Sequence, residues 1–195
     1  MAVSLFSATM SEQIKLVAVT NRKLCDTDFC LRIKELCLEN TYRIILREKD
    51  LSENEYGNLF KKLMEICCKY KTELIGNKFE SMVKEIGGKG FQYSYANFME
   101  KDKRHFDIEG VSVHSVEEAI NAKHKGADYL IAGHIFVTDC KKGVEPRGLD
   151  FLKSVCSAVD IPVFAIGGIN DKNAESCIKV GAKGVCKMSG AMKSK

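Results

Sequence analysis

The sequence predicts an α/β protein of one domain, a (β/α)8 TIM barrel whose last helix is truncated or missing. Short apolar runs alternate with longer amphipathic stretches along the chain, which is typical of a parallel sheet covered by helices. The phrases KGADYL and VGAKGV recur at the same point of successive units, each with a glycine just after a helix. Eight such units favour a closed barrel, and an open doubly wound sheet is the alternative.

The expected strands are the short apolar runs. They lie at 15–20, 42–48, 72–77, 90–95, 108–114, 127–133, 161–168 and 184–190. The stretches between them have apolar residues at helical spacing, except for a charged connection that ends at residue 107. Helices are therefore expected at 28–39, 51–70, 79–88, 115–125, 149–159 and from 170 or 171 to 181.

Two helix starts carry a sequence signal of their own. Ser52 and Ser115 are each followed three positions later by a glutamate, at Glu55 and Glu118. This spacing is typical of a capping box, in which serine and glutamate satisfy the free N–H groups of the first helical turn. Pro162 falls at the first residue of the seventh strand, where a missing N–H is tolerated.

The eighth unit is incomplete in the sequence. The chain stops at Lys195, five residues after Gly190, which leaves almost nothing for an eighth helix. An uncovered barrel would expose an apolar stripe. We therefore expect the single domain, residues 1–195, to cover this groove with its N-terminal extension, residues 1–13, with a partner subunit, or with both. A homodimer is the expected assembly.

The composition excludes several classes of function. The formal net charge of +4 is spread along 195 residues without a finger, helix-turn-helix or RNA-binding pattern, so no nucleic acid partner is expected. No apolar run approaches the length of about 18 residues that spans a membrane, and residues 1–10 lack the basic start of a signal peptide. Nine cysteines, an odd number without a CxxC pair, indicate a reduced, cytoplasmic protein.

Two groups of small residues predict a phosphate site. Active sites of such barrels lie at the C-terminal ends of the strands, and the turns after the last two strands commonly bind phosphate. Gly167 and Gly168 end the seventh strand, and Met188, Ser189 and Gly190 end the eighth. Glycine lets backbone N–H groups approach phosphate oxygens closely. The alternative is that these glycines only make the turns.

Arg47 and His134 are the candidate catalytic side chains. Arg47 closes the second strand, where a guanidinium suits a carboxylate or phosphate; the alternative is a surface arginine paired with Glu48 or Asp50. His134 ends the sixth strand, in AGHIFVTDCKKG, where an imidazole that titrates near neutrality suits a general base; the alternative is a packing histidine. Asp139 is the sole loop acid near the strand ends of the second half, so no metal site is expected.

Several segments of the chain together resemble one known superfamily. LVAVTN, ILREKD, IGNK, GVSVHSVEEA, GADYLIAGHIFVTDCKKG, IPVFAIGGIN and GAKGVCKMSG follow one another in its order and spacing. They are similar to the thiamine phosphate synthase/TenI superfamily from about residue 15 to residue 192, and the similarity is strongest from 111 to 190.

The superfamily holds two activities that differ at the strand ends. The synthase joins a pyrimidine pyrophosphate to a thiazole phosphate with Mg²⁺, and it has a GPVFPTxTK-like motif where the TenI-type thiazole tautomerase has GHxFxTDCKKG, as here. By resemblance, Lys78 and Asn97 replace magnesium-binding aspartates, and Ile45 replaces a pyrimidine-binding glutamine. The resemblance therefore implies a tautomerase without metal or cofactor. The synthase and a non-catalytic thiazole phosphate-binding regulator remain alternatives.

The resemblance also implies roles for individual residues. His134 would carry a proton from the ring carbon that bears a carboxylate to an exocyclic carbon, which makes a small-molecule thiazole phosphate aromatic. Arg47 would hold the carboxylate, and the glycine turns with Ser189 would hold the phosphate. Cys140 would line the site, and Lys187 would either contact phosphate or point outward. The remaining expected binding residues are Asn77, Thr138, Lys141 and Met188.

Overall fold

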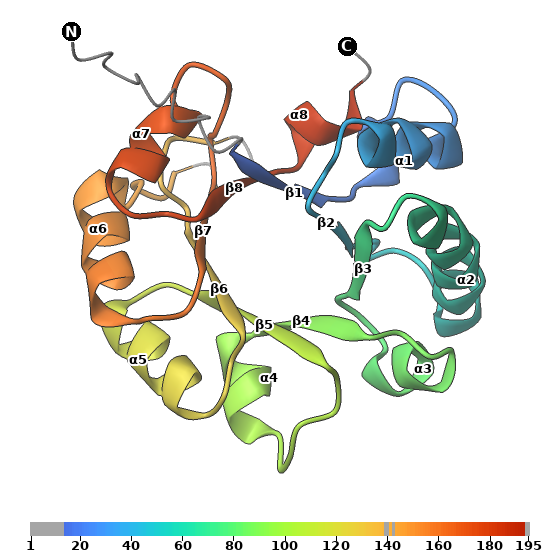
Figure 1. The fold of residues 1–195 in the computed structure, drawn as a ribbon, viewed down its shortest axis with the longest axis horizontal. Coiled ribbons are helices and arrows are strands. Elements are labelled where there is room, and N and C mark those ends of the chain that lie inside the picture. Colours follow the sequence, from blue (N-terminus) through green and yellow to red (C-terminus); the bar gives the residue numbers. More distant parts are fainter. Residues whose placement is uncertain (1–13, 139–140, 142, 194–195) are drawn as a thin grey trace, which may run out of the picture.

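A computed structural model describes residues 14–138, 141 and 143–193 of the chain and contains the expected closed barrel. Eight parallel strands pair in chain order, β8 pairs with β1, and the helices lie outside the ring of strands (Figure 1). The open-sheet alternative is therefore wrong. The strands are β1 (Lys15–Val19), β2 (Arg43–Leu46), β3 (Glu73–Gly76), β4 (Gly90–Ser94), β5 (Ile108–Val113), β6 (Tyr129–Gly133), β7 (Val163–Ile166) and β8 (Gly184–Lys187).

The expected helices occur in the expected order; η1 and α4 were not expected, α3 is shorter than predicted, and α7 begins later. The helices are η1 (Arg22–Leu24), α1 (Phe29–Leu38), α2 (Glu53–Lys69), α3 (Glu80–Glu85), α4 (Tyr95–Glu100), α5 (Val116–His124), α6 (Gly148–Ala158), α7 (Ala174–Lys179) and α8 (Ser189–Met192). The connection after β4 contains α4, where a loop was expected, because Ser94 caps a helix of only six residues, which is too short for a clear apolar pattern. Helix α7 begins after Asn173 instead of at 170 or 171, because residues 170–173 form a hydrogen-bonded turn.

The two predicted helix starts are confirmed. Ser52 and Glu55 form a reciprocal capping box at the start of α2. The Ser115 side chain accepts a hydrogen bond from the N–H of Glu118 at the start of α5. These caps fix where the chain leaves the strand ends, and therefore where each loop at the mouth of the barrel begins.

Strand alternation separates two hydrophobic cores. Ala18 and Val185 face the helices and join the larger core between strands and helices. Their chain neighbours Val17 and Cys186 face the barrel axis. The interior core is completed by the side chains Val19, Ile45, Ile75, Tyr129, Ile131 and Phe164. The interior is therefore filled by side chains, and free space remains only toward one end of the barrel.

The end at which the strands begin is closed by an arginine. The Arg43 guanidinium lies 4.4 Å from the ring centre of Tyr129 and 4.6 Å from that of Tyr42, and it pairs with Glu73. Two aromatic rings and a carboxylate compensate its charge in this apolar setting. These side chains close the end of the barrel at which the strands begin, so the accessible opening, or mouth, is at the C-terminal ends of the strands.

The last helix is truncated, as expected, and α1 supports it. Helix α8 spans only Ser189–Met192, and it lies beside α1 in Figure 1. Its Met192 side chain is fully buried, and the Arg32 side chain, 2% exposed, donates a 2.9 Å hydrogen bond to the Ala191 carbonyl. Part of the groove is therefore covered by α8 itself. The expected cover by residues 1–13 lies outside the described residues, and the homodimer stays a prediction.

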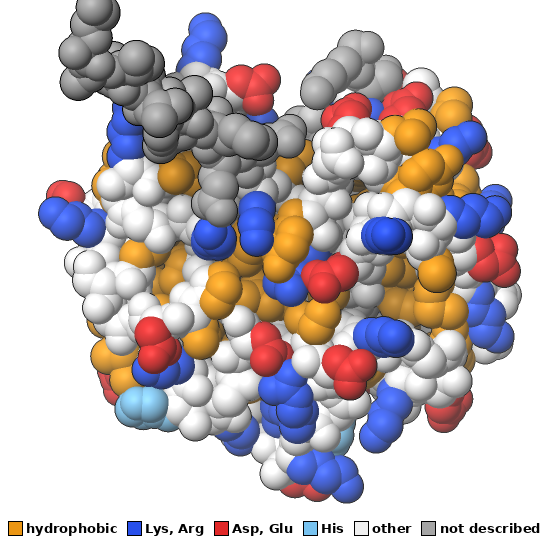
Figure 2. All heavy atoms as spheres, viewed as in Figure 1, with side chains coloured by type: hydrophobic (Ala, Val, Ile, Leu, Met, Phe, Trp, Pro, Cys, Tyr) orange, Lys and Arg blue, Asp and Glu red, His pale blue; other side chains and the backbone are white. Residues whose placement is uncertain are grey.

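The distribution of charged side chains, the length of the helices and the state of the cysteines can be compared with what the composition predicts. Figure 2 shows Lys and Arg side chains distributed around one face and mixed with Asp and Glu, not gathered in one block. Within the described ranges, no helix is long and apolar enough to cross a membrane. The eight described cysteines are free thiols, while Cys140 lies outside the described residues.

We expect Arg32→Met to lower the free energy of unfolding by about 1–3 kcal/mol, because the change leaves a buried carbonyl without its charged donor. Arg32 also pairs with Glu35 and Glu39 at 2.9 and 3.2 Å. Urea denaturation measures the effect. The control is Lys34→Met on the same helix, where the side chain is exposed and the expected change is within about 0.5 kcal/mol. Equal losses in both variants would show that Arg32 does not support α8.

Candidate functional site

The C-terminal ends of the strands surround a cavity of about 540 Å³. Its wall takes residues from strand ends or following loops around the whole barrel. All ten side chains or glycines predicted as site residues lie on this wall: Arg47, Asn77, His134, Thr138, Lys141, Gly167, Gly168, Met188, Ser189 and Gly190. Their placement agrees with the sequence analysis, and their chemical roles stay predictions.

His134 is held by the loop that follows it. The ring is buried, with 5% of the residue exposed, and its Nε2 lies 3.2 Å from the Val144 carbonyl oxygen. A carbonyl can only accept a hydrogen bond, so Nε2 carries the proton in this contact. In the neutral ring, Nδ1 then holds the free lone pair. The His134 carbonyl accepts a 3.0 Å hydrogen bond from the Arg147 N–H, which brings the end of the loop back to its start.

Gly167 and Gly168 fix the position of the His134 segment. Both have positive φ, +102° and +66°. A Cβ on Gly167 would lie 2.3 Å from the His134 Cβ, and one on Gly168 would lie 2.3 Å from the Val137 carbonyl oxygen. The turn after β7 therefore needs glycine for close packing against the loop after β6, besides any contact with phosphate. This geometry is compatible with both explanations for the two glycines, namely that they only make the turn and that they bind an anion.

Arg47 is half-buried at the cavity wall. It is not a surface arginine paired with Glu48 or Asp50, which was the alternative. Glu48 and Asp50 instead pair with Arg22, at 3.0 and 2.6 Å, and Asp50 also pairs with Lys23 at 2.9 Å. Within the described part of the chain, the Arg47 guanidinium makes no ion pair, and its Nη1 lies 3.9 Å from the Met188 sulfur. It therefore remains available to an anion.

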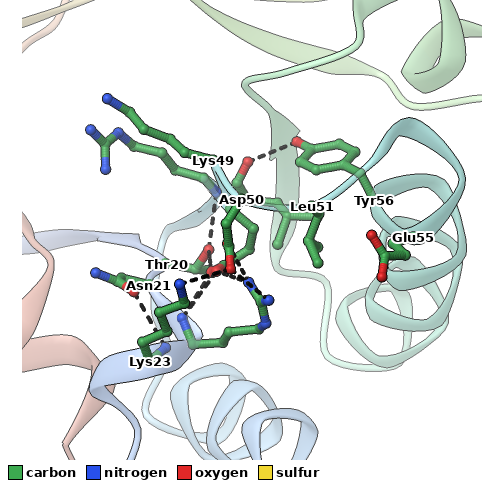
Figure 3. A network of polar contacts seen from close by, with 12 residues as sticks. Thr20, Asn21, Lys23, Lys49, Asp50, Leu51, Glu55 and Tyr56 are labelled. Carbon is green, nitrogen blue, oxygen red and sulfur yellow. Dashed lines mark hydrogen bonds and ion pairs between the residues drawn. The ribbon is translucent and has the colours of Figure 1, made fainter.

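A polar network behind Arg47 sets its backbone. The Thr20 hydroxyl donates a 2.7 Å hydrogen bond to the buried Glu48 carboxylate and accepts a 3.0 Å bond from the Arg47 N–H. Figure 3 shows Thr20, Lys23 and Asp50 meeting in this network. The hydrogen bonds from Arg22 and then Lys23 hold the pKa of Asp50 well below its usual value. The network thus connects the ends of β1 and β2.

Amides line the cavity wall at the ends of β3 and β4. The Asn77 side chain donates to the Gln92 carbonyl at 2.8 Å, and the Gln92 Nε2 donates to the Ser112 hydroxyl at 3.1 Å. Asn77 receives further support from Tyr56, whose hydroxyl accepts from the Asn77 N–H at 3.1 Å and donates to the Leu46 carbonyl at 2.7 Å. No carboxylate belongs to the cavity wall among the described residues.

The two residues at the expected positions of synthase aspartates do not line the cavity. The Lys78 ammonium donates to the carbonyls of Lys49 and Leu51 at 3.0 and 2.9 Å, so it is bound to the loop after β2. Asn97 lies exposed on α4. No group of three potential metal-ligating His, Cys, Asp or Glu side chains occurs in the portions that the structure describes. A hard divalent cation prefers carboxylate oxygens, so the described wall is unsuited to one.

Lys187 lines the cavity and also pairs with an acidic residue outside it. It lines the cavity next to the turn at Ser189 and Gly190, and its ammonium pairs with Asp171, an exposed residue in the turn before α7. The expected lining role of Cys140 lies outside the described residues. Lys187 therefore adds positive charge at the end of the cavity where phosphate is expected.

His114 is a cavity residue that lies at a predicted strand end but was not among the predicted site residues. It directly follows β5, and its Nδ1 lies 2.9 Å from the Gly133 carbonyl oxygen. The signal that could have identified it was its place at a strand end, the same signal that identified His134. The capping serine next to it favoured a structural interpretation instead.

Comparisons with known proteins agree on one family. A sequence profile described as thiamine monophosphate synthase matches residues 16–191. A thiamine-phosphate synthase of Clostridium acetobutylicum is 35% identical over 187 residues, which cover 91% of this chain and 87% of that protein. A putative thiamine-phosphate synthase 2 of Aquifex aeolicus is 32% identical over 178 residues, covering 90% of this chain and 96% of that protein.

Solved structures show the same relationship. The thiamine phosphate pyrophosphorylase from Pyrococcus furiosus superposes with a TM-score of 0.79 at 29% identity, and the match covers 93% of this chain and 89% of that one. A 3-hexulose-6-phosphate synthase superposes with a TM-score of 0.61 at 13% identity, which shows a shared fold alone.

We expect Thr20→Val to lower the free energy of unfolding by about 1–3 kcal/mol, because the buried Glu48 carboxylate loses a donor and the Arg47 N–H loses its acceptor. Chemical denaturation measures the loss. Thr41→Val is the matched control, because the buried Thr41 hydroxyl has no hydrogen-bond partner among the described residues. That control is expected to be neutral or stabilising, and a loss as large as that of Thr20→Val would argue against the network.

We expect Gly167→Ala to displace His134 and to weaken the binding of inorganic phosphate, measured by calorimetric titration. Gly126→Ala is the control, because Gly126 has a similar φ of +96° but open space around its Cβ. The control should lose only the stability that a left-handed alanine costs, about 1–2 kcal/mol, while overpacking should cost Gly167→Ala about 1–3 kcal/mol more. Identical stability and phosphate binding in both variants would contradict the packing argument.

Proposed function

The chain belongs to the thiamine monophosphate synthase family, and from this premise we propose that it is a thiazole tautomerase, which converts a non-aromatic carboxythiazole phosphate into its aromatic isomer. One observation carries the proposal: the buried His134 lies on a cavity wall that contains arginine, lysine and amides but no described carboxylate. Such a wall provides a base and binds anions without the oxygen ligands that a divalent cation needs.

His134 is the base and the acid of the proposed reaction. Its Nε2–H is engaged by the Val144 carbonyl, which leaves Nδ1 to accept the proton from the ring carbon that bears the carboxylate. The bonding electrons move through the ring to the exocyclic double bond, and a proton then bonds to the exocyclic carbon. One proton leaves and one arrives, so the product is an isomer. General acid–base catalysis of this kind contributes about 10²–10⁴-fold.

Cations at the cavity wall stabilise the negative charge of the substrate. Arg47 is free of described ion pairs and can bind the carboxylate in a bidentate manner, where it also stabilises charge that develops as the proton leaves. The N–H groups of the turns at Gly167–Gly168 and Ser189–Gly190 would bind the phosphate. Lys187 and Lys141, which also line the cavity, would add positive potential.

A magnesium-dependent synthase is the second candidate, and a specific observation favours it: relatives at 32–35% identity are named thiamine-phosphate synthase. The residues present do not fit the metal, because Lys78 is bound to the carbonyls of Lys49 and Leu51, and Asn97 lies outside the cavity wall. The ends of β3 and β4 contribute Asn77 and Gln92 to the cavity, and an amide is a weaker magnesium ligand than a carboxylate. A regulator that binds thiazole phosphate without turnover is the third candidate.

Turnover of the carboxythiazole phosphate tautomer, followed by the ultraviolet absorbance of the aromatic product, tests the proposal. We expect turnover with chelator present and a fall in kcat of at least about 10²-fold in His134→Asn, because that variant lacks a basic ring nitrogen. His124→Asn serves as control, because His124 is exposed at the end of α5 and remote from the cavity wall.

The other candidates predict different results in the same experiment. Formation of thiamine phosphate from the pyrimidine pyrophosphate and the thiazole phosphate, dependent on Mg²⁺, would establish the synthase. Binding of the aromatic thiazole phosphate without turnover of either substrate would establish the regulator. An unchanged kcat in His134→Asn would remove this side chain from the mechanism.

A further inference from the structure

We infer that the Asp171 carboxylate competes with the phosphate group of the substrate for the ammonium of Lys187, and that this competition lowers the affinity of the cavity for phosphate. The inference rests on the proposed function, because it takes the phosphate to lie at the two glycine turns. It assigns a role to a carboxylate that does not itself line the cavity, and it predicts that the loss of this carboxylate strengthens binding.

Lys187 reaches the cavity from the last position of β8. Its neighbour Cys186 faces the barrel axis, and successive side chains of a strand point to opposite faces, so the alternation directs Lys187 toward the helices. The side chain nevertheless lines the cavity. Its Cδ lies 3.9 Å from the position that a Cβ on Gly190 would take. The lysine therefore runs beside the turn at which phosphate is expected.

Asp171 is presented by the other glycine turn. It lies three residues after Gly168, in a segment that side-chain amides hold in place. The Asn173 side chain donates to the Gly168 carbonyl at 3.0 Å, and its Oδ1 accepts from the Asn170 N–H at 2.8 Å. The ion pair between Lys187 and Asp171 therefore connects the loop after β7 with the end of β8, the two segments that flank the expected phosphate.

The exposure of the two side chains allows the lysine to change its partner. The Asp171 side chain is 94% exposed, whereas that of Lys187 is 18% exposed. An exposed carboxylate is solvated by water when its partner leaves, which is why exposed ion pairs contribute little to stability. The lysine is largely withdrawn from water and still requires an anion beside it. A phosphate in the cavity provides that anion.

A phosphate is a stronger partner for Lys187 than Asp171 is. A phosphate monoester carries a charge of about −1.5 to −2 at pH 7 and has three acceptor oxygens, whereas the carboxylate carries a single charge. The N–H groups of the Gly167–Gly168 turn would bind other oxygens of the same phosphate. Phosphate therefore replaces the carboxylate on the lysine, and the free energy lost with the ion pair reduces the affinity that an unpaired lysine would give.

Two other roles of Asp171 predict different results. If the carboxylate held Lys187 in its binding position, removal of Asp171 would weaken phosphate binding. If Asp171 acted only through its negative charge, its removal would strengthen binding whether or not Lys187 were present. Glu175 provides a control of equal charge, because it pairs with Lys179 at 3.0 Å on α7 and neither residue lines the cavity.

Calorimetric titration of the full chain with inorganic phosphate tests the inference. We expect Asp171→Asn to bind phosphate about 2–5-fold more tightly, because an exposed ion pair no longer competes for the lysine. Lys187→Met should bind it at least about 10-fold more weakly, because a charged donor is lost. In the double variant, Asp171→Asn should add little to the effect of Lys187→Met. Glu175→Gln should bind phosphate like the wild type.

Each possible result supports or overturns the inference. Weaker binding in Asp171→Asn overturns it and indicates that the carboxylate positions the lysine. The same gain from Asp171→Asn with and without Lys187, or from Glu175→Gln, overturns it in favour of a general charge effect. A wild type that does not bind phosphate, or an unchanged affinity in Lys187→Met, also overturns it.

The tautomerase proposal is decided separately, by aromatisation of the substrate. A wild type that shows the expected phosphate results but no aromatisation would retain the competition for Lys187 and lose only the thiazole substrate. A wild type that aromatises the substrate while Asp171→Asn leaves phosphate affinity unchanged would retain the proposed function and lose the competition.

Discussion

The pairing of β8 with β1 is the constraint on which the remainder of the structure depends. It runs from Lys15 opposite Gly184 to Ala18 opposite Lys187, and it closes the sheet. Gly184 is required there, because a Cβ would lie 2.2 Å from the Lys15 carbonyl oxygen. Closure brings every strand end to one opening, so that Arg47 after β2 contacts Met188 after β8. An open sheet would leave these residues at distant edges, and no cavity would form between them.

Contacts between neighbouring strand ends convert this opening into a rigid site. The Thr20 hydroxyl joins β1 to β2, and the Tyr56 hydroxyl joins β2 to β3 (Figure 3). Burial raises the pKa of Tyr56 to about 12, so its hydroxyl stays a donor to the Leu46 carbonyl at any physiological pH. Gly167 against His134 joins β7 to β6. Side chains that would bind substrate are therefore held by contacts between neighbouring strand ends, and two of the supporting residues, Thr20 and Tyr56, do not line the cavity themselves.

The sequence contains enough information to predict the barrel and the residues at its mouth, but not their partners. Apolar alternation predicts strand ends, and strand ends in a closed barrel must converge, which is why Arg47 and His134 reach one cavity. Which residue pairs with which depends on loop paths that have no periodic signal. Glu48 and Asp50 form ion pairs with Arg22 instead of with Arg47, and the Lys78 ammonium donates a hydrogen bond to the loop after β2. The short helix α4 was missed for the same reason, since six residues are too few to show a helical period.

The chemistry that this site can perform depends on a few side chains at the strand ends. A barrel fixes where strand ends point, and the chemistry follows from what stands there. Carboxylates at the ends of β3 and β4 would bind a divalent cation, whereas the Asn77 and Gln92 amides found there suit a neutral, hydrogen-bonding wall. With Arg47 unpaired on one side and His134 buried on the other, an anionic ring between them would meet a cation and a base. Proton transfer needs only those two groups, while coupling to a pyrophosphate also needs charge neutralisation that amides do not supply. Under the proposed function, the barrel therefore holds a proton-transfer site at strand ends that provide cations and amides.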